Sequence, residues 1–282
     1  MLDCCIILNP NARAARRMQL VDQLGEVARG ATVRLTTAPG DAEGLARAAA
    51  REGFKTVVAA GGDGTVNEVL CGIVGTSARL GVLPVGTANV FARELGIPLD
   101  WEEAWVRIGQ GREQLVDVGW ANGSPFIQLA GVGFDGEVIA AVTPHSKTLL
   151  GPGAYVLSGL LQIGKPRPTL RVEAEGLPVM EGVWVMVGLG RFYGGPIGMF
   201  PRASNTDGLL DVLVVKDLGL LSSLCYMAGI PLGWHTRMAG IEYFQTRRLR
   251  VEGDVAMELD GESRGRGPVD FRVSQQMLRV LR

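Results

Sequence analysis

The residues best suited to phosphate chemistry form the run Gly61-Gly62-Asp63-Gly64-Thr65. The apolar stretch Thr56 to Ala60 precedes this run and the helix-like segment Val66 to Gly75 follows it, so the run lies where a strand meets a helix. Glycines allow positive φ and close approach of the backbone to a ligand, and the free N–H groups of a helix start attract anions. This pattern predicts a phosphate site.

Asp63 is an unusual residue for a phosphate loop, because its carboxylate would repel the ligand. We expect it to hold a phosphate-bound Mg²⁺, to order the loop through backbone N–H groups, or to take part in proton transfer. An Asp-Gly turn between a strand and a helix is the alternative. The two glycines before the acid, and Thr65 after it as a candidate N-cap, favour the phosphate site.

A second strand-to-helix turn has the sequence Gly86-Thr87-Ala88-Asn89. Thr87 could bind phosphate with its hydroxyl and backbone N–H, or it could cap the helix that follows. The residues alone leave both interpretations open.

Two acid-bearing turns lie in the second half of the chain. The run Asp207-Gly208-Leu209-Leu210-Asp211 indicates a turn into a strand, where a carboxylate beside backbone carbonyls suits a hard cation such as Mg²⁺. Asp260-Gly261-Glu262 follows a strand-like run, and its two carboxylates could divide proton acceptance from the orientation of a metal or nucleophile. Plain turns are the alternative for both.

The elements that must position these residues fall into two groups. In the first group strand and helix signals alternate, which predicts a parallel sheet covered on both faces, with ligands at the carboxyl ends of its strands. The predicted strands are Cys4 to Leu8, Ala31 to Thr36, Thr56 to Ala60 and Leu80 to Val85, and the predicted helices are Arg13 to Ala28, Asp41 to Arg51, Val66 to Gly75, Ala88 to Leu95 and Trp101 to Gly109.

After Gln110 strand-like runs separated by Gly, Pro and Asn predict an antiparallel, sandwich-like β-rich domain. We therefore predict two domains, an α/β domain at 1–111 and a β-rich domain at 112–282, and leave open whether a last strand near 277–282 returns to the first. The predicted strands are Leu115 to Trp120, Phe126 to Leu129, Thr169 to Ala174, Val183 to Gly188, Leu209 to Val215, Arg247 to Val251, Val255 to Leu259 and Val269 to Val273.

Composition excludes some classes of function. The chain has 282 residues, of which 47% are hydrophobic, and a formal net charge of -1, so no basic excess indicates a nucleic-acid partner. Its four cysteines form no C-x-x-C pair, and we expect free, packed thiols in a reducing compartment. Because the amino terminus shows no secretory signal pattern, we expect the cytoplasm.

Two stretches, Thr148 to Gly164 and Leu218 to Thr236, contain no charged residue. Both contain Gly and Pro, and neither has an apolar run of transmembrane length. We expect each to be a buried helix, although two such stretches in one domain are also compatible with an apolar cleft or interfacial surface.

Taken together, these motifs resemble the bacterial diacylglycerol kinase-like lipid kinases, the group that also includes diacylglycerol, sphingosine and ceramide kinase catalytic domains. The resemblance covers nearly the whole chain, and the motifs in this order are highly specific. They are Asn9-Pro10, G-G-D-G-T-V-N-E at Gly61 to Glu68, P-V-G-T-A-N-V-F-A-R at Pro84 to Arg93, G-V-G-F-D at Gly131 to Asp135, D-G-L-L-D at Asp207 to Asp211 and D-G-E at Asp260 to Glu262.

The resemblance implies an ATP site between an α/β domain and a β-rich domain, with Mg²⁺ as cofactor. Asp260 or Glu262 would accept the proton of the substrate hydroxyl, and a structural Mg²⁺ would bind Asp207 with the carbonyls of Ser204 and Leu209. The residues implied to contact the nucleotide are Asn9, Thr36, Gly62, Asp63, Gly64, Thr65, Val66, Asn67, Glu68 and Thr87.

The sequence therefore predicts an ATP- and Mg²⁺-dependent lipid kinase of phospholipid metabolism that acts on a lipid hydroxyl at a membrane surface, with peripheral membrane contact. The nearest alternative is an NAD kinase, whose second loop the run Pro84 to Arg93 does not match. A nucleotide- or lipid-sensing module without activity is another, and the retained acids Asp63, Asp260 and Glu262 argue against it. A dehydrogenase is disfavoured because Asn9 to Arg13 contains no glycine. The lipid substrate and a homodimeric state stay open.

Overall fold

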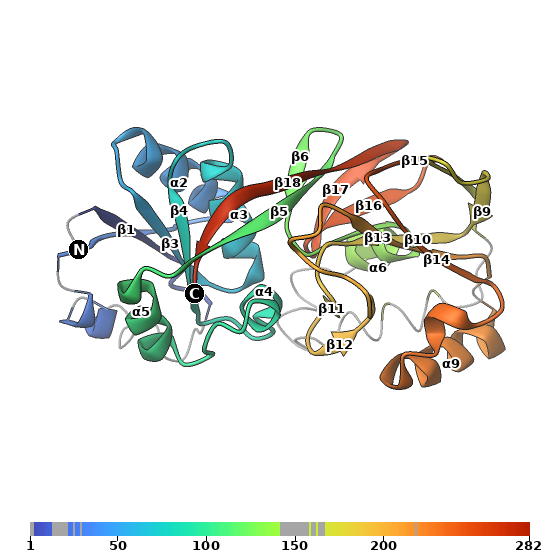
Figure 1. The fold of residues 1–282 in the computed structure, drawn as a ribbon, viewed down its shortest axis with the longest axis horizontal. Coiled ribbons are helices and arrows are strands. Elements are labelled where there is room, and N and C mark those ends of the chain that lie inside the picture. The colour runs from blue at the N-terminus through green and yellow to red at the C-terminus, as the bar shows by residue number, and fades with distance from the viewer. Residues whose placement is uncertain are drawn as a thin grey trace. The chain divides into compact units, whose positions relative to one another are not determined.

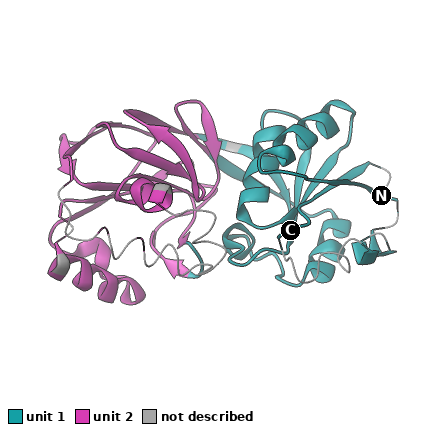
Figure 2. Cartoon of the chain, turned by 180° about the vertical axis from the view of Figure 1, so that it is seen from behind, with its two compact units in different colours: residues 1–118, 194–196, 274–282 teal, residues 119–193, 197–273 magenta. Residues whose placement is uncertain are grey.

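The computed structural model describes residues 3–12, 22–24, 26–28, 30–141, 158, 162, 167–217 and 219–282. The chain forms two compact units (Figure 2). Unit 1 consists of Met1–Val118, Gly194–Pro196 and Ser274–Arg282, and unit 2 of Gly119–Tyr193 and Ile197–Val273. Sequence analysis places the change of domain near Gly111, and the compact units divide after Val118.

Unit 1 contains a parallel sheet in the order β2-β1-β3-β4-β18 (Figure 1). The three strands β1, β3 and β4 are mostly apolar and, except for the first residue of β4, buried along their whole length, as expected of parallel strands covered on both faces. Their bounds are Cys4–Leu8 for β1, Thr32–Leu35 for β2, Thr56–Gly61 for β3, Arg79–Pro84 for β4 and Val269–Leu281 for β18.

The helices of unit 1 pack closely because small residues lie at the contacts. A Cβ at Gly72 would lie 2.5 Å from the carbonyl oxygen of Glu43, and one at Gly81 would lie 2.9 Å from Ile108, so glycine permits both packings. The described helices of unit 1 are α2 (Asp41–Arg51), α3 (Asp63–Ile73), α4 (Val90–Glu94) and α5 (Trp101–Gln110).

Unit 2 is a β sandwich. One sheet is antiparallel, in the order β14-β13-β10-β7-β16-β17, and the facing layer contains the end of β5, β6, β8, β9, β15 and the first part of β18. The core between them is built from alternating apolar residues such as Val172, Val187, Val212, Leu249 and Phe271. Bounds in the first sheet are Leu129–Gly133 (β7), Trp184–Gly188 (β10), Leu210–Val215 (β13), Ile241–Thr246 (β14), Ala256–Leu259 (β16) and Glu262–Arg266 (β17).

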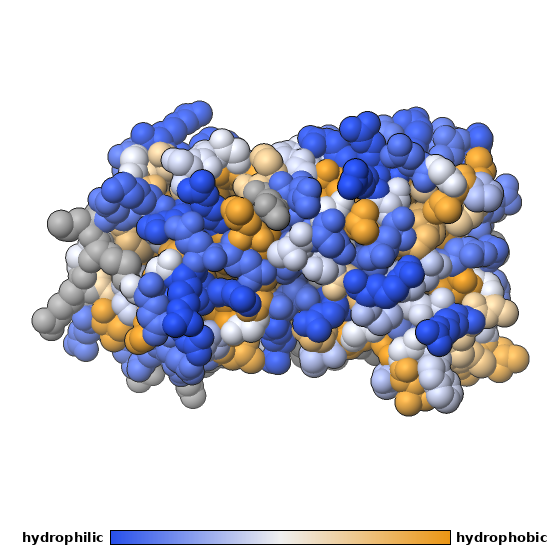
Figure 3. All heavy atoms as spheres, viewed as in Figure 1, coloured by the Kyte–Doolittle hydropathy of each residue, from blue (hydrophilic) through white to orange (hydrophobic). Residues whose placement is uncertain are grey.

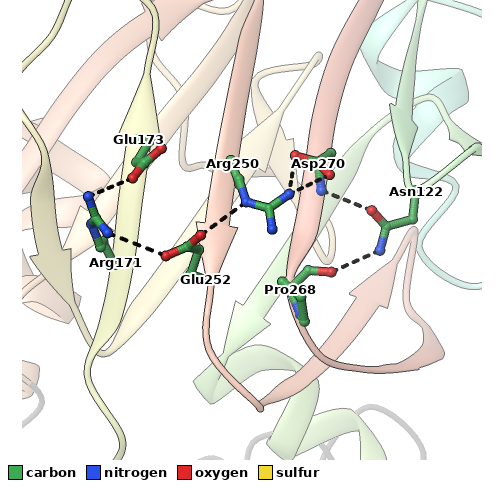
Figure 4. Close-up of polar contacts among 7 residues, drawn as sticks. All are labelled: Asn122, Arg171, Glu173, Arg250, Glu252, Pro268 and Asp270. Atoms are coloured by element: carbon green, nitrogen blue, oxygen red, sulfur yellow. Dashed lines mark hydrogen bonds and ion pairs between the residues drawn. The ribbon is translucent and has the colours of Figure 1, made fainter.

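The facing layer has a surface network of ion pairs across its strands (Figure 4). Arg250 binds Asp270 at 2.8 Å and Glu252 at 3.2 Å, and Arg171 binds Glu173 at 2.8 Å. These side chains are exposed, so each pair contributes at most about 1 kcal/mol. The strands of this layer are β5 (Glu113–Ala121), β6 (Ser124–Phe126), β8 (Leu170–Ala174), β9 (Met180–Gly182) and β15 (Arg248–Glu252).

A second apolar cluster lies on the other face of the antiparallel sheet. There Met186 and Leu213 pack with Phe200, and with Tyr226 and Ile230 from the helical segment that follows β13. The remaining described elements of unit 2 are α6 (Phe134–Ala141), β11 (Phe192–Tyr193), β12 (Ile197–Gly198), α9 (Leu220–Gly229), η2 (Ile230–Leu232) and η3 (His235–Arg237).

The predicted fold class, an α/β domain followed by a β-rich sandwich-like domain, is confirmed. The sequence did not predict β14 or β17, and most of the helix predicted at Arg13 to Ala28 and of the stretch Thr148 to Gly164 lies outside the described residues. Cys4 and Cys5 are buried free thiols as expected, whereas Cys225 is exposed. Among the described residues, no helix is long and apolar enough to span a bilayer.

Candidate functional site

The predicted nucleotide-binding residues of unit 1 gather at the carboxyl ends of its parallel strands. Asn9 directly follows β1, Thr36 follows β2, and Thr87 lies on the loop after β4. The backbone N–H of Asn9 donates to the carbonyl of Ala60 at 2.9 Å, and its side-chain amide donates to the hydroxyl of Thr65 at 3.3 Å. The first turn and the glycine loop are therefore joined.

The glycine loop starts its helix earlier than expected. Helix α3 begins at Asp63 with Gly62 as N-cap, so Thr65 lies in the first turn and the prediction of Thr65 as N-cap is wrong. An acid in the first turn is favoured by the helix dipole, which explains the earlier start. The N–H groups in the first turn of α3, which have no partner within the helix, belong to residues of the glycine loop, as a phosphate site requires.

The glycines are needed for the contact between two loops and not for positive φ. Gly62 has φ −93°, and neither it nor Gly86 is among the positive-φ glycines, so that expectation is wrong. A Cβ at Gly86 would lie 2.4 Å from the Cα of Gly62. The loops after β3 and β4 thus cross with their backbones in contact, and a side chain at Gly86 would separate them.

Asp63 links the same two loops. Its carboxylate accepts the backbone N–H of Phe91, in the first turn of α4, at 3.1 Å. Burial raises the pKa of this carboxyl, and hydrogen bonds from the amides of Phe91 and Val90 oppose the rise. Of the three roles considered for Asp63, this geometry matches the ordering of the loops through backbone N–H groups.

Asn89 shapes the second loop, a role that sequence analysis did not assign to it. It is the N-cap of α4 in the left-handed region at φ 50°, so the alternative that Thr87 caps this helix is wrong. Its side chain accepts the N–H of Gly86 at 3.1 Å and donates to the carbonyl of Pro84 at 3.3 Å. Thr87 is left exposed at the tip of the loop.

The other predicted residues of α3 point into the protein. Val66 and Asn67 are buried, and the carboxylate of Glu68 accepts the N–H groups of Gly40 and Ala42, at 2.9 and 3.0 Å, at the start of α2. Their side chains thus hold α3 in place. A nucleotide contact in this part of the run would therefore be made by main-chain groups.

In unit 2, Asp260 is held by the backbone of a distant segment. Its carboxylate accepts the N–H groups of Ile127, Gln128 and Leu129 at 2.9 to 3.0 Å. These bonds interrupt strand pairing, which is why the single strand predicted at Phe126 to Leu129 is instead two strands, β6 and β7. The Asp260 carboxylate is thus committed to backbone donors.

Glu262 begins β17 directly after a tight hairpin. Asp260 and Gly261 have φ 48° and 85°, as a two-residue type I′ turn requires, and Leu259 pairs with Glu262. The Glu262 side chain is partly exposed and forms an ion pair with Arg264 at 3.0 Å. Of the two acids of this turn, Glu262 is the one whose carboxylate faces solvent and other side chains.

The turn at Asp207 has the oxygen donors that a hard cation prefers. Asp207 is exposed, its carboxylate accepts the N–H of Leu209 at 3.0 Å, and its own N–H faces the carbonyl of Ser204 at 3.5 Å. The residues expected to bind Mg²⁺ thus share one turn. In the described part of the chain, no group of three acid, Cys or His side chains is placed to bind a metal ion. The Mg²⁺ site at this turn, made of one carboxylate and two backbone carbonyls, stays a prediction.

A buried acid pair lies behind the hairpin, and sequence reasoning missed it. Asp135 and Glu258 are both fully buried, and Tyr193 donates to Asp135 at 2.5 Å. Burial raises the pKa of Asp135 to about 6 and, together with the charge of Asp135, raises that of Glu258 well above its ordinary value. The folded chain therefore holds the protons of this pair more tightly than ordinary carboxyls would be held. The G-V-G-F-D motif contained Asp135, but only the fold shows its partner.

Comparison with known proteins gives a consistent result. Residues 3–121 match the family model of the diacylglycerol kinase catalytic domain, and residues 129–282 match that of the YegS C-terminal NAD kinase beta sandwich-like domain. A diacylglycerol kinase of Bacillus subtilis is 35% identical over 280 residues, covering 94% of this chain and 91% of the relative. One from Staphylococcus aureus is 32% identical over 238 residues, covering 82% and 76%. The crystal structure of a diacylglycerol kinase from Bacillus anthracis superposes with a TM-score of 0.79 at 27% identity, covering 99% of this chain and 96% of that one.

Proposed function

Because the chain belongs to the diacylglycerol kinase family, we propose that it transfers the γ-phosphate of ATP to the hydroxyl of diacylglycerol or a related lipid alcohol. The observation that supports this best is the crossing of the two glycine loops in unit 1. Asp63 holds the two loops together and Asn89 shapes the second one, and the first-turn amides of α3 lie at the carboxyl ends of the parallel strands.

The loop crossing supports a role in holding the phosphates of ATP. Phosphoryl transfer requires that the phosphates be positioned and their developing charge stabilised, and preformed backbone amides do both without reorganisation. Asp63 keeps the loops in register, Thr65 is held by Asn9, and Thr87 remains exposed to contact a phosphate. Mg²⁺ bound with the ATP would neutralise the charge that develops on the transferred group.

Glu262 is the residue we assign as proton acceptor. As the substrate oxygen bonds to the γ-phosphorus, the bond to ADP breaks and the hydroxyl proton passes to the Glu262 carboxylate. Asp260 is less suited because its two oxygens accept three backbone N–H groups. Asp260 instead fixes the hairpin that positions Glu262.

The test is transfer of labelled phosphate from ATP in mixed micelles that contain diacylglycerol, phosphatidylglycerol, ceramide or a sphingoid base, with NAD as a separate acceptor. We expect product with a lipid, diacylglycerol first among them, and loss of product when Mg²⁺ is removed with a chelator. Product with NAD alone would overturn the proposal.

The proton acceptor is tested with Glu262→Gln, for which we expect a fall in kcat of roughly 10²- to 10⁴-fold at unchanged stability. Arg264→Gln is the matched control, because it removes the ion pair of Glu262 but keeps the carboxylate. If Arg264→Gln lowers kcat as much as Glu262→Gln, the ion pair and not proton transfer explains the effect.

A further inference from the structure

The uncharged segment between Asp217 and Arg237 forms α9, η2 and η3, and it is not the buried helix that its composition predicts. A helix without charge is expected in a protein core or in contact with lipid. Leu221, Trp234 and Leu232 are instead 77%, 62% and 59% exposed, and Leu224 and Met227 are about half exposed. Figure 3 shows this surface as hydrophobic side chains over α9.

The segment is firmly attached to unit 2, so its exposure does not reflect a loose helix. The Asp217 carboxylate accepts the N–H of Gly219 at 3.0 Å and the hydroxyl of Ser222 at 2.7 Å at the start of α9. Tyr226 packs inward and donates to the carbonyl of Ala239 at 3.2 Å. One face of α9 is thus fixed to the sandwich while the opposite face presents leucine and methionine to solvent.

A basic pocket adjoins this apolar face. The pocket has a volume of about 360 Å³, and its lining residues are Pro201, Arg202, Gly233, Thr236, Arg237 and Tyr243. Gly233, Thr236 and Arg237 flank the exposed Trp234 in the chain, so pocket and apolar face are continuous. The lining contains two arginines and no acid, and neither arginine forms an ion pair with a residue that the structure describes.

Arg202 is oriented by its neighbours. Its guanidinium lies over the Tyr243 ring, 4.4 Å from the centroid, and its backbone N–H donates to the Tyr243 hydroxyl at 3.1 Å. That hydroxyl in turn donates to the buried carboxylate of Asp211 at 2.5 Å, and Asp211 is not among the residues that line the pocket. Arg202 is therefore held in place at the pocket, and the two arginines make a basic site that suits a phosphate group.

We propose that the outward face of α9 and η2, together with the pocket of Arg202 and Arg237, docks onto an anionic phospholipid bilayer. The leucines and Met227 would enter the acyl boundary, Trp234 would lie at the interface as its amphipathic ring prefers, and the arginines would bind a lipid phosphate. Charge complementarity selects this occupant, because an uncharged apolar face bordered by two arginines matches a negatively charged lipid surface. The inference rests on the proposed function in so far as a lipid substrate requires contact with a bilayer.

The first experiment is co-sedimentation of the full chain, without ATP, with vesicles of phosphatidylcholine that contain about 30 mol% phosphatidylglycerol or none. We expect binding to the anionic vesicles that weakens as salt rises from about 0.05 to 0.5 M. Leu221→Gln should lower the partition coefficient roughly tenfold, and Arg237→Gln roughly fivefold with a smaller salt dependence. The control Leu177→Gln changes an exposed leucine on another turn of unit 2 and should leave binding unchanged.

The exposed Cys225 on α9 offers a second measurement. A polarity-sensitive fluorophore on Cys225 should shift to the blue in anionic vesicles and keep its spectrum in buffer. Cys4 and Cys5 are buried, and burial raises the pKa of Cys4 to about 12, so they should not react; Cys71→Ser removes the remaining thiol. Excess inorganic phosphate is a further control. If the arginine pocket binds free phosphate, the fluorophore spectrum should stay unchanged, because phosphate brings no apolar surroundings to Cys225.

The proposal is overturned if Leu221→Gln and Arg237→Gln bind vesicles as the unmodified chain does, or if sedimentation shows a dimer through this face and no vesicle binding. Kinase activity on lipid dispersed in detergent micelles keeps the two proposals separate. If lipid phosphorylation persists and the variants bind vesicles normally, the docking surface is contradicted and the proposed kinase function is not. Loss of vesicle binding in the variants, with no lipid phosphorylated by any form, supports the surface and contradicts the kinase.

Discussion

Asp63 in unit 1 and Asp260 in unit 2 occupy the same two-residue sequence, Asp-Gly, in different local structures. Asp63 starts a helix and Asp260 forms a type I′ hairpin, yet the carboxylate of each accepts backbone N–H groups from a segment far away in the chain. The Asp207-Gly208 pair differs, because the Asp207 carboxylate accepts the N–H of Leu209 in its own turn. The comparison teaches that the same two residues occur at a helix start and in a hairpin turn, and that backbone amides from distant segments determine the role of the acid.

The largest stability effect is expected for Asp260→Ala. This change leaves three N–H groups of buried residues without an acceptor and places alanine at φ 48°, which we expect to cost about 3–5 kcal/mol. Urea unfolding followed by circular dichroism measures it. Asp260→Asn keeps one acceptor oxygen and tolerates positive φ, so it should cost clearly less; equal losses would refute the role of the carboxylate.

The acids behind the hairpin should make the stability of the fold depend on pH. Asp135 has a pKa raised from 3.8 to about 6 and Glu258 one raised well above 4.5, so the folded chain binds these protons more tightly than the unfolded chain. The contribution of these acids to the free energy of unfolding should therefore be fully present below about pH 4 and be lost as pH rises through 6, by up to roughly 3 kcal/mol for Asp135. Urea midpoints between pH 4 and 8 test this, and Asp135→Asn should flatten the profile. A profile that Asp135→Asn does not change would rule out the pair as its cause.

A smaller effect is expected at the glycine loop. Asp63→Ala removes the acceptor for the first turn of α4 and should lower the free energy of unfolding by about 1–2 kcal/mol. The free energy of ATP binding should be reduced by more than the free energy of unfolding, because the two loops lose their link. Isothermal titration with ATP and urea unfolding of the same variant give both numbers. If the variant loses stability but binds ATP with unchanged affinity, Asp63 supports the fold and not the nucleotide site.

The smallest effect is expected for Asp207→Ala in the absence of divalent metal. The side chain is exposed and supports its own turn, so the loss should be below about 1 kcal/mol. Thermal unfolding with and without Mg²⁺ tests whether this turn binds the ion. Mg²⁺ should stabilise the unmodified chain and not the variant. Equal stabilisation of both would contradict a Mg²⁺ site at this turn.

Much of unit 1 could be predicted from sequence because its signals are local. The strand at Cys4 to Leu8 and the helix at Asp41 to Arg51 were predicted at the observed bounds, since apolar runs and helix periodicity are written in consecutive residues. The roles of Asn89 and Glu68 could not be predicted, because their partners are fixed only when loops and helices pack together.

In unit 2 the features that the sequence did not predict depend mostly on contacts between residues far apart in the chain. Phe126 to Leu129 was predicted as one strand because its residues are apolar, and the break comes from the carboxylate of Asp260, more than a hundred residues later in the chain. Exposure is likewise a property of the assembled surface. Composition alone therefore could not distinguish a buried helix from α9, whose apolar face is turned to solvent.

The last strand adds a consequence for biosynthesis. In β18 the residue Val280 pairs with Leu80 of β4, so the sheet of unit 1 is completed by residues that the ribosome makes after the whole of unit 2. A nascent chain that has emerged only as far as Val118 holds β4 without its neighbour and must wait for the rest. The amino-terminal unit therefore cannot complete its sheet until the carboxy-terminal residues have been made, although it is the first to be synthesised.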